Sequence, residues 1–465
     1  MYRRLQSVPF SILAIWLLAV LPARLIGDDQ TSSSADDGTA LSELATDELK
    51  SKEDEEYFEL LKLFADTIDQ VERNYVEPIN KRELMEAAIK GVLSKLDPYS
   101  DYISPDGIDD FRTEVESEFG GIGIRVGEKK GRIYVVTPLH DTPAHQAGIV
   151  AGDVILKIGD TDTRGLDLDA AIQLMKGKIG TTIELSIRHE SGETDLVELE
   201  RQVIQLETVM GRKRRADGDW DFMLDSDQRI GYIRVFSFSR ATADDVRKAV
   251  TELMDAEVRG LILDLRLNPG GLLSCAIEIA DLFLEEGIIV GTQGRNIKEQ
   301  TWTASSDGTI DDIPMIVLVN QYSASASEIV SAALQDHERA IVIGNRTWGK
   351  GSVQNIIELE GGKSALKLTT ASYTRPNGKN IHRFNGATEE DEWGVRPNAG
   401  FEIVMSPQEI RDLVNWNYKT EIIHANGATP EQKSPFKDRQ LQRGVQHLIA
   451  KLANAREQDK QKSQD

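Results

Sequence analysis

The sequence predicts a multidomain protein that combines α+β and α/β architecture, and three observations carry this prediction. The chain has 465 residues, which is more than one hydrophobic core accommodates. Early in the chain, apolar residues recur every three or four positions, which is the spacing of amphipathic helices. From about Val203 onward, strand-like runs alternate with helical runs, which is typical of an α/β core.

The N-terminal segment has the pattern of a targeting signal followed by a spacer. Two arginines precede the apolar run Phe10 to Leu21, so residues 1–27 are expected to be a signal peptide or a signal anchor. The run is shorter than the roughly 20 residues of a membrane span, and no small-x-small cleavage site precedes Asp28, so removal and retention both stay open. Residues 28–52 are rich in Ser, Thr, Asp and Glu and are expected to form an acidic flexible linker. We therefore expect an exported, periplasmic or extracytoplasmic protein, membrane-attached if the segment is retained.

Two regions precede the α/β core. Residues 53–110 form a predicted helical region, which Pro78 divides into two helices. Residues 111–203 change to glycines and short β-type runs, which predict a compact domain. Its expected elements are strands over Ile122–Val126, Arg132–Val136, Asp153–Ile158 and Thr182–Ile187 and a helix over Leu168–Met175.

Residues 204–400 are predicted to form the α/β core, and residues 401–465 a C-terminal extension with one helix over Gln440–Ala455. The expected core strands are Arg229–Phe236, Leu261–Leu265, Met315–Asn320 and Ile341–Gly344. The expected core helices are Asp244–Met254, Leu273–Leu284 and Ser325–Gln335.

Composition limits the partners and the chemistry. Asp and Glu number 77 against 54 Lys and Arg, a net charge of -23 that repels phosphate backbones, so no nucleic-acid partner is expected. The basic run Arg212 to Arg215 is accordingly interpreted as a solvated loop. Cys275 is the one cysteine, which excludes an intrachain disulfide and any CxxC motif, and its apolar surroundings favour a buried structural thiol.

A serine stands where a buried strand turns into a helix. Ser325 follows the apolar run Ile316 to Val319 and precedes Glu328 by three positions. This spacing is that of a capping box, in which the hydroxyl bonds a backbone N–H of the first turn. The same position suits a nucleophile, because free N–H groups at a helix N-terminus stabilise a developing oxyanion. Both interpretations remain open from this segment alone.

A lysine lies between two glycines further along the chain. Lys350 is flanked by Gly349 and Gly351 and preceded by Trp348, which suits a tight and poorly hydrated loop. Desolvation lowers the pKa of a lysine, as a general base for a serine requires. A plain surface loop is the alternative, whereas a phosphate-binding P-loop is excluded because Gly351 stands where Ser or Thr is required.

A third segment offers backbone donors at the end of a strand. Gly270 and Gly271 follow Leu263 to Pro269 and let the backbone approach a ligand closely, although such a turn also ends many ordinary strands. The chain lacks HExxH, GxSxG and a GxGxxG between strand and helix. His337 adjoins charged residues and is expected at an exposed helix end.

Four segments together resemble the C-terminal processing, or tail-specific, serine peptidase family over about Tyr57 to Asn398. They are FGGIGI at 119–124, LDLRLNPGG at 263–271, NQYSASASEI at 320–329 and GNRTWGKGSVQ at 344–354. The resemblance implies a ClpP/crotonase-like protease core with an inserted PDZ domain. It implies the following roles: Ser325 as nucleophile, Lys350 as general base, Gln354 as the residue that orients the lysine, Gly270, Gly271 and Ala326 as oxyanion-hole donors, and Asp336 as a supporting acid.

By the same resemblance, residues 111–203 are the PDZ domain, and Gly121, Ile122, Gly123 and Ile124 form its loop for a substrate C-terminus. The implied substrates are exported or membrane proteins with apolar C-terminal tails. No metal, nucleotide or other cofactor is implied, and a homo-oligomer stays open. Two residues depart from the family pattern: Leu267 replaces a polar residue, and Arg375 interrupts a Tyr-x-Thr-Pro stretch.

Two other functions are compatible with parts of the pattern. A catalytically idle PDZ scaffold would bind tails without cutting them, but the chain keeps Ser325, Lys350 and Gln354. A trypsin-like PDZ protease would need GxSxG and a PDZ domain after its core, and the chain has neither.

Overall fold

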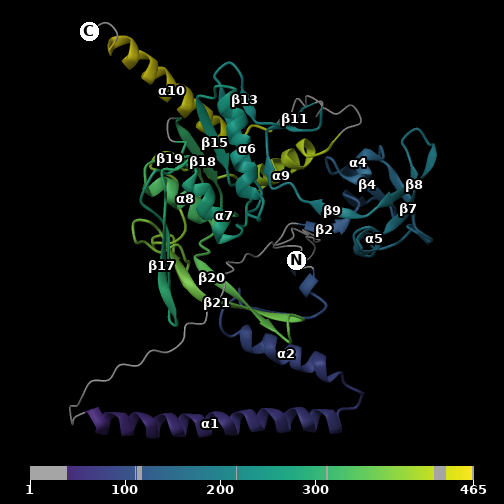
Figure 1. The fold of residues 1–465 in the computed structure, drawn as a ribbon, viewed down its shortest axis with the longest axis vertical. Coiled ribbons are helices and arrows are strands. Elements are labelled where there is room, and N and C mark those ends of the chain that lie inside the picture. Colours follow the sequence, from purple (N-terminus) through teal and green to yellow (C-terminus); the bar gives the residue numbers. More distant parts are fainter. Residues whose placement is uncertain are drawn as a thin grey trace, which may run out of the picture.

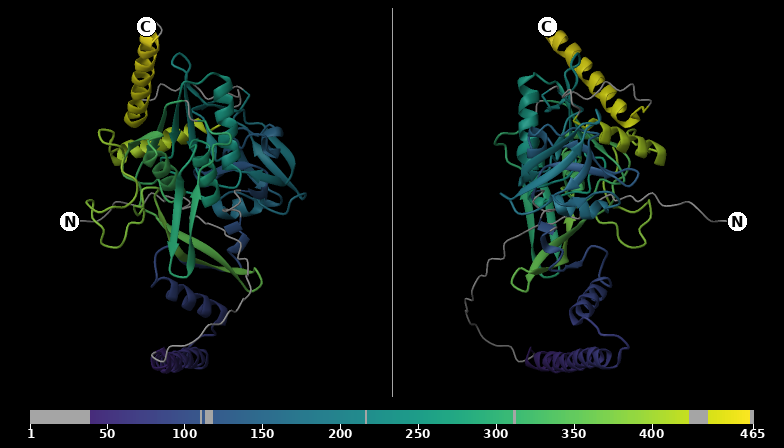
Figure 2. Two further views of the ribbon diagram at one scale, coloured as in Figure 1. Left: turned by 60° about the vertical axis from the view of Figure 1, so that its left-hand side comes forward. Right: turned by 90° about the vertical axis from the view of Figure 1, so that its right-hand side faces the viewer.

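The computed structural model describes residues 39–109, 111–112, 118–215, 217–310, 313–423 and 436–462. Figure 1 shows a central sheet with its helices, a small β module to one side and the long helix α1 apart from both. Two further views show the same separation of α1 from the rest of the protein (Figure 2).

Two helices form the N-terminal region, as predicted. Helix α1 spans Thr39–Asn74 and α2 spans Lys81–Leu93, with Pro78 in the connection between them. Asn80 caps α2, since its side chain accepts the Arg82 N–H at 3.0 Å. The flexible spacer expected over residues 28–52 needs correction, because residues 39–52 are helical and belong to α1. The expected signal segment and residues 28–38 lie outside the described residues, and no described helix has the length and apolar character of a membrane span.

The small β module, residues 118–205, contains the predicted strands and helix with ends shifted by a few residues. Its sheet has the order β3-β4-β5-β7-β8, with β6 paired to β5, so β3 is an edge strand. The elements are β3 Ile124–Glu128, β4 Ile133–Pro138, α4 Pro143–Gln146, β5 Val154–Ile158, β6 Thr161–Asp162, α5 Leu168–Met175, β7 Thr182–Arg188 and β8 Thr194–Glu200. A separate ribbon of β2 (Glu118–Gly121) and β9 (Gln202–Gln205) connects the module to the core. Buried Ile133, Ile155 and Leu185 lie in the module's own hydrophobic core.

The central sheet follows the predicted alternation. Its parallel strands are β14 Ile230–Val235, β15 Gly260–Asp264, β18 Met315–Val319 and β19 Ala340–Gly344. The helices between them are α6 Thr242–Asp255, α7 Leu273–Asp281 and α8 Ala326–Asp336. Two short strands, β10 Val209–Met210 and β13 Met223–Asp225, pair antiparallel with β14. A ribbon of β11 (Lys213–Arg214) and β12 (Trp220–Asp221) stands apart from this sheet.

The C-terminal segment completes the core. Helices α6 to α8 contribute to the hydrophobic cluster on one face of the sheet, and α10, Arg439–Lys462, covers the other. Leu441 and Leu448 of α10 belong to one buried cluster with Ile262, Ile316 and Ile343 of the sheet. Helix α9, Pro407–Thr420, was not predicted, although Ser406 caps it and Pro407 stands at its first turn.

A second sheet was not predicted from the sequence. Its strands are β1 Asp101–Ile103, β16 Ile288–Gly294, β17 Ile297–Thr303, β20 Ser352–Leu359 and β21 Ser364–Thr374. The order is β1-β21-β16-β17, with β20 on β21. Because β1 follows α2 in the chain and pairs with β21, this sheet joins the N-terminal region to the core.

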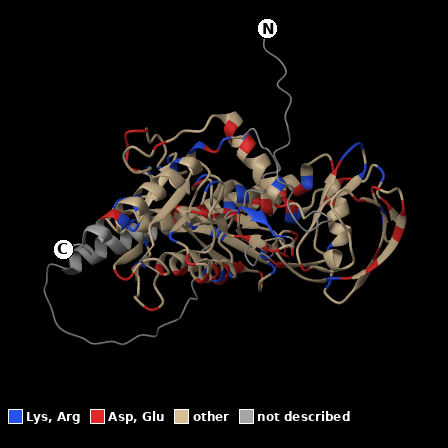
Figure 3. Cartoon of the chain, turned by 90° about the horizontal axis from the view of Figure 1, so that it is seen from above, with Lys and Arg blue, Asp and Glu red and all other residues tan. Residues whose placement is uncertain are grey.

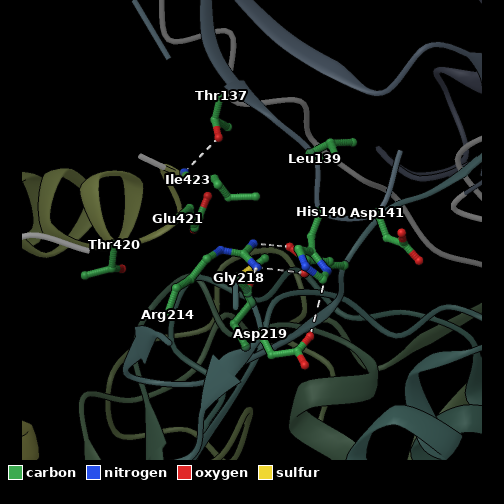
Figure 4. Close-up of polar contacts among 12 residues, drawn as sticks. Thr137, Leu139, His140, Asp141, Arg214, Gly218, Asp219, Thr420, Glu421 and Ile423 are labelled. Carbon is green, nitrogen blue, oxygen red and sulfur yellow. Dashed lines mark hydrogen bonds and ion pairs between the residues drawn. The ribbon is translucent and has the colours of Figure 1, made fainter. Parts of the chain in front are cut away.

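The small β module is attached to the core through the end of α9. Glu421 lies between two guanidinium groups, 2.7 Å from Arg125 of β3 and 2.8 Å from Arg234 of β14. The Ile423 N–H donates to Thr137 Oγ1 of β4 at 2.9 Å (Figure 4). Burial raises the pKa of Glu421, but the two arginines hold it below its ordinary value. A buried carboxylate therefore links strands of two domains.

A second contact between the same parts corrects the interpretation of the basic run. His140 of the module lies 3.8 Å from the Asp219 carboxylate, and Arg214 donates to the Gly218 carbonyl at 2.6 Å (Figure 4). Arg214 is only 4% exposed and is paired with Glu207, so it is not part of a solvated loop. Along the rest of the described chain, acidic and basic positions are interspersed (Figure 3).

A buried charge cluster anchors α10 beneath the loop that follows β15. Arg266 lies 2.6 Å from Asp264 and 2.8 Å from Asp438, and all three side chains are at most 5% exposed. The Tyr232 hydroxyl donates to Asp264 at 2.7 Å. Both buried carboxylates depend on Arg266 for compensation of their charge, so the three side chains are held in a well-defined geometry.

Arg266→Met should destabilise the protein by about 3–5 kcal/mol, because it leaves two buried carboxylates facing each other. Urea unfolding gives the measurement. Arg439→Met is the matched control: Arg439 pairs with Glu409 at the surface, and exposed pairs contribute little. Equal small effects of both variants would contradict a structural role for the cluster.

Candidate active site

Three loops meet at the carboxyl edge of the parallel sheet. They follow β15, β18 and β19, whose carboxyl ends lie side by side because the strands are parallel. The Ser323 hydroxyl donates to the Leu265 carbonyl at 2.8 Å, and the Trp348 N–H donates to the Ser323 carbonyl at 2.9 Å. The loop after β18 is thus bonded to both of its neighbours.

Ser325 stands at the N-terminus of α8 in a strained conformation. Its φ is 54° and ψ is -114°, outside the region that residues with a side chain prefer, and it is 3% exposed. Such a conformation costs about 1–3 kcal/mol and persists only where the surroundings enforce it. The sharp turn between β18 and α8 therefore places a serine at a helix N-terminus, a common position for a nucleophile.

Lys350 is buried in a loop that only glycines permit. It is 1% exposed, and its Nζ lies 5.2 Å from the centre of the Tyr99 ring. A Cβ at Gly351 would lie 2.3 Å from the His382 backbone nitrogen, and one at Gly349 would lie 2.7 Å from the Arg383 Cβ. The flanking glycines are therefore required because residues 381–383 run directly beside the loop.

Glu328 joins the serine turn to the lysine loop. Its Oε2 accepts the N–H groups of Ser325 and Lys350, each at 2.8 Å. Its Oε1 accepts the Gly349 N–H at 2.7 Å and the Thr347 hydroxyl at 2.5 Å. Because both backbone nitrogens lie 2.8 Å from the same oxygen, the backbone nitrogens of Ser325 and Lys350 are at most twice 2.8 Å apart.

The environment of Glu328 also affects its ionisation. The residue is fully buried, and burial raises its pKa to about 7, although the four donors oppose this shift. The bond from the Ser325 N–H is the glutamate half of the predicted capping box. The same carboxylate therefore caps α8 and joins the serine turn to the lysine loop. The capping contact was predicted from the sequence, whereas the contact with the lysine loop was not.

The expected oxyanion donors lie beside Ser325. A Cβ at Gly270 would lie 2.8 Å from the Ser325 Cβ, and φ there is 113°, so only glycine allows this approach. The Gly270 N–H itself donates to Asn268 Oδ1 at 2.8 Å. This bond leaves Gly271 and Ala326 as the better candidates of the three predicted donors.

Gln354 lies on β20, directly after the lysine loop, and is 1% exposed. Its Nε2 donates to the hydroxyls of Ser352 at 2.9 Å and Thr369 at 3.2 Å. Its Oε1 is buried and has no hydrogen-bond partner among the described residues. A buried acceptor of this kind is suited to a donor that arrives or moves during the reaction.

Asp336 lies at the opposite end of α8 from Ser325. Over 11 residues the helix extends about 16 Å, so any influence on the serine passes through the helix. Asp336 accepts Nη2 of Arg375 at 2.5 Å, which explains the departure at position 375: the arginine neutralises a nearly buried acid.

Two alternative reactive side chains are engaged elsewhere. His337 also lies at the far end of α8, where its Nε2 is 2.8 Å from the Ile288 carbonyl. Cys275 is buried in α7, and burial raises the pKa of its thiol to about 12, as suits a structural thiol.

Leu267 keeps a backbone bond despite its departure from the family pattern. Its φ is 64°, and its N–H donates to Asn320 Oδ1 at 3.1 Å. Its side chain packs against Met405, Ile410 and Leu413. The bond between the loops after β15 and β18 therefore does not require a polar side chain at this position.

The expected tail-binding loop lies in the small β module, between β2 and β3. Ile122 is 2% exposed, and Ile124 packs against the same core. Gly123 has a φ of 76°, and its carbonyl accepts the Leu139 N–H at 2.9 Å. The loop leads into edge strand β3, against which α5 packs.

Comparison with known proteins gives three family matches along the chain. Residues 229–397 match Peptidase family S41, residues 120–200 match the PDZ domain, and residues 29–107 match the Activating protease CtpB N-terminal domain. The core and the small β module thus define a PDZ-containing serine peptidase.

Individual relatives narrow this class. A carboxy-terminal-processing protease of Bartonella bacilliformis is 36% identical over 407 residues, covering 86% of this chain and 90% of that protein. The carboxy-terminal processing protease CtpA of Bacillus subtilis is 35% identical over 68% of this chain and 65% of that protein. The chain belongs to the carboxy-terminal processing protease family. Among solved structures, the photosystem II D1 C-terminal processing protease is similar at 27% identity over 78% of this chain and 97% of that one, with a TM-score of 0.42.

Glu328→Gln should change how stability depends on pH. The folded-state pKa of about 7 lies above the ordinary 4.5, so the contribution of this carboxyl is fully present below about 4.5 and lost as the pH rises through about 7. The stability of the parent protein relative to the variant should fall by up to about 3 kcal/mol between pH 5 and pH 8. Urea unfolding of both proteins at the two pH values gives the measurement.

Glu409→Gln is the matched control, because Glu409 occupies the same third position of a capping box at α9. Arg439 and the Ser406 N–H lower the pKa of Glu409 to about 2, so its contribution changes only in more acidic solution. A pH-independent difference for Glu328→Gln would mean that the four donors keep Glu328 ionised throughout.

Proposed function

We propose that this peptidase cleaves exported or membrane proteins near apolar C-terminal tails, with Ser325 as nucleophile and Lys350 as general base. The observation that carries the proposal is the shared carboxylate: Glu328 Oε2 accepts the backbone N–H groups of both residues at 2.8 Å. The backbones of two buried residues 25 positions apart in the sequence are thereby brought together, which supports a reaction between their side chains.

The reaction has two steps. Neutral Lys350 takes the proton of the Ser325 hydroxyl while Oγ attacks the peptide carbonyl, and the N–H groups of Gly271 and Ala326 stabilise the oxyanion. The ammonium of Lys350 then protonates the leaving amine, and the C-terminal product departs. In the second step Lys350 activates a water molecule that hydrolyses the acyl-enzyme.

Burial supports lysine as the base. A side chain that is 1% exposed loses most of its hydration, which disfavours the ammonium form. The buried Oε1 of Gln354 would accept a hydrogen bond from the amine and orient it toward the serine. No step in this sequence of events requires a residue from outside the three loops and β20.

The PDZ domain would present the substrate tail. Among the described residues β3 pairs with β4 alone, so an added strand would pair with its other edge. Helix α5 packs against β3, and the loop from Gly121 to Ile124 precedes it. Backbone N–H groups of such a loop bind a terminal carboxylate, while the groove accepts apolar side chains. Export is part of the proposal, and fractionation of cells with intact-mass measurement would show both the compartment and whether residues 1–27 are removed.

Ser325→Ala and Lys350→Ala should each lower kcat/KM by at least about 1000-fold, because each removes one member of a unit that acts together. Lys350→Arg should be equally inactive, since arginine stays protonated and cannot act as a base. Mass spectrometry of the products of a model protein gives the rates and the cleavage site. Ser331→Ala is the matched control: this buried serine lies in the same helix and donates to the Ser327 carbonyl. Undiminished cleavage by either alanine variant of the pair would exclude the dyad, and tail binding without cleavage by the parent protein would favour a scaffold.

A peptide with a free C-terminus should be cleaved with a kcat/KM roughly 10-fold to 100-fold above that of its C-terminal amide, because charge-assisted bonds to the carboxylate are lost in the amide. Gly123→Ala should remove most of this preference, since a Cβ there would lie 2.2 Å from the Thr142 Cβ. Gly148→Ala is the control, because it has a similar φ of 79° and open space around it. Equal rates for acid and amide would contradict recognition of the tail by this loop.

A further inference from the structure

A short segment of the N-terminal region reaches the lysine loop. Residues 97–100 connect α2 to β1, and the Asp97 carboxylate holds them in a tight turn. Its Oδ1 accepts the N–H groups of Tyr99 at 2.7 Å and Ser100 at 2.8 Å, and its Oδ2 accepts the Ser100 hydroxyl at 2.8 Å. The direction of the Tyr99 side chain is therefore set by three bonds within the turn.

The same turn is bonded to the strand that supports Gln354. The Thr369 hydroxyl of β21 donates to Asp97 Oδ1 at 3.2 Å, and the Thr369 N–H donates to the Ser100 hydroxyl at 3.0 Å. The Thr369 hydroxyl also accepts Nε2 of Gln354 at 3.2 Å. The register of β1 on β21, with Asp101 opposite Lys367, continues this attachment. The turn is thus held on the core, beside the candidate active site.

The Tyr99 ring lies over the amine of Lys350. Nζ is 5.2 Å from the ring centre, within the roughly 6 Å at which a cation interacts with the face of an aromatic ring. The Tyr99 and His382 rings pack in a T-shaped arrangement, with 6.3 Å between centroids and 73° between planes. Burial raises the pKa of Tyr99, so the ring stays neutral at working pH.

We propose that Tyr99 is a positioning residue that stabilises the ammonium form of Lys350 after the proton of Ser325 has been transferred. The inference rests on the Ser325–Lys350 dyad proposed above and deepens it. The positive charge on Nζ is absent in the resting base and develops in the transition state of acylation. A fixed ring face therefore lowers the energy of that state relative to the resting enzyme. Burial disfavours the ammonium form, and the ring offsets part of this effect. The amine therefore remains basic enough to take the serine proton.

Other titratable groups surround the lysine loop and are present in every variant. Glu328 accepts the Lys350 N–H, and burial lowers the pKa of His382. Asp97 lies behind Tyr99; burial would raise its pKa, but the hydrogen bonds from Ser100 and Tyr99 lower it overall. Because no Tyr99 substitution removes these groups, differences between variants report on the ring.

Tyr99→Phe and Tyr99→Leu separate the ring from the hydroxyl. Two rates are measured from pH 5 to pH 10: the rate at which a fluorophosphonate probe phosphonylates Ser325 with release of fluoride, and kcat for a peptide. Tyr99→Phe should keep the parent profile, because the phenylalanine face also attracts a cation. Tyr99→Leu should move the acid limb to lower pH by about one unit and lower the plateau rate by roughly 3-fold to 30-fold, because an aliphatic side chain keeps the site dry without stabilising the ammonium.

Controls keep the test decisive. Tyr57→Leu changes an exposed tyrosine on α1 and should leave the profile unchanged. Melting temperatures show whether Tyr99→Leu folds, and Tyr99→Met replaces it if it does not. A Tyr99→Leu profile that superimposes on the parent profile, or equal shifts in Tyr99→Leu and Tyr99→Phe, would overturn the inference while leaving the dyad intact. Activity in Lys350→Ala would instead remove the dyad itself.

Discussion

The site depends on one buried carboxylate. Glu328 receives four hydrogen bonds, one from the serine turn and three from Thr347, Gly349 and Lys350 of the lysine loop. Both segments have unusual backbones: Ser325 is strained, and the lysine loop is built around two glycines. Burying a charge without partners is costly, so the loss of any donor weakens the site. Glu328 therefore couples the stability of the strained turn to that of the glycine loop.

Much of the core could be predicted because its sequence patterns are local. The parallel strands are continuous apolar runs and the helices between them have regular apolar spacing, so their positions were predicted to within a few residues. The second sheet was missed because β17, β20 and β21 alternate only weakly and are half exposed. The role of α10 was missed for another reason. Its apolar residues are few, and only the structure shows that Leu441 and Leu448 close the far face of the sheet.

In the candidate site, too, features encoded by neighbouring residues were predicted, whereas contacts between residues far apart in the sequence were not. Ser325 and Lys350 were predicted as catalytic residues from motifs, and the contact of Ser325 with Glu328 from capping geometry, because each signal spans only a few residues. The bond from Glu328 to the lysine loop links residues 22 positions apart, and the contact of Tyr99 with Lys350 links residues 251 positions apart, and neither leaves a periodic signal. The departure at Arg375 became interpretable in the same way, once Asp336 was found beside it.

Two peripheral regions contact the core at points that differ in their distance from the chemistry. The PDZ domain is held by Glu421, whose core partner Arg234 lies on β14, a strand that carries none of the predicted catalytic residues. A ligand shifts a conformational equilibrium only when it binds one state of the protein more tightly than the other. A tail that binds the PDZ domain would therefore affect the proposed dyad by changing contacts between the domains, such as Arg125 with Glu421 or Thr137 with Ile423. The N-terminal region, in contrast, places Tyr99 directly over Lys350. In the proposed mechanism, delivery of the substrate and the basicity of the lysine would therefore depend on separate contacts, and a change in one need not disturb the other.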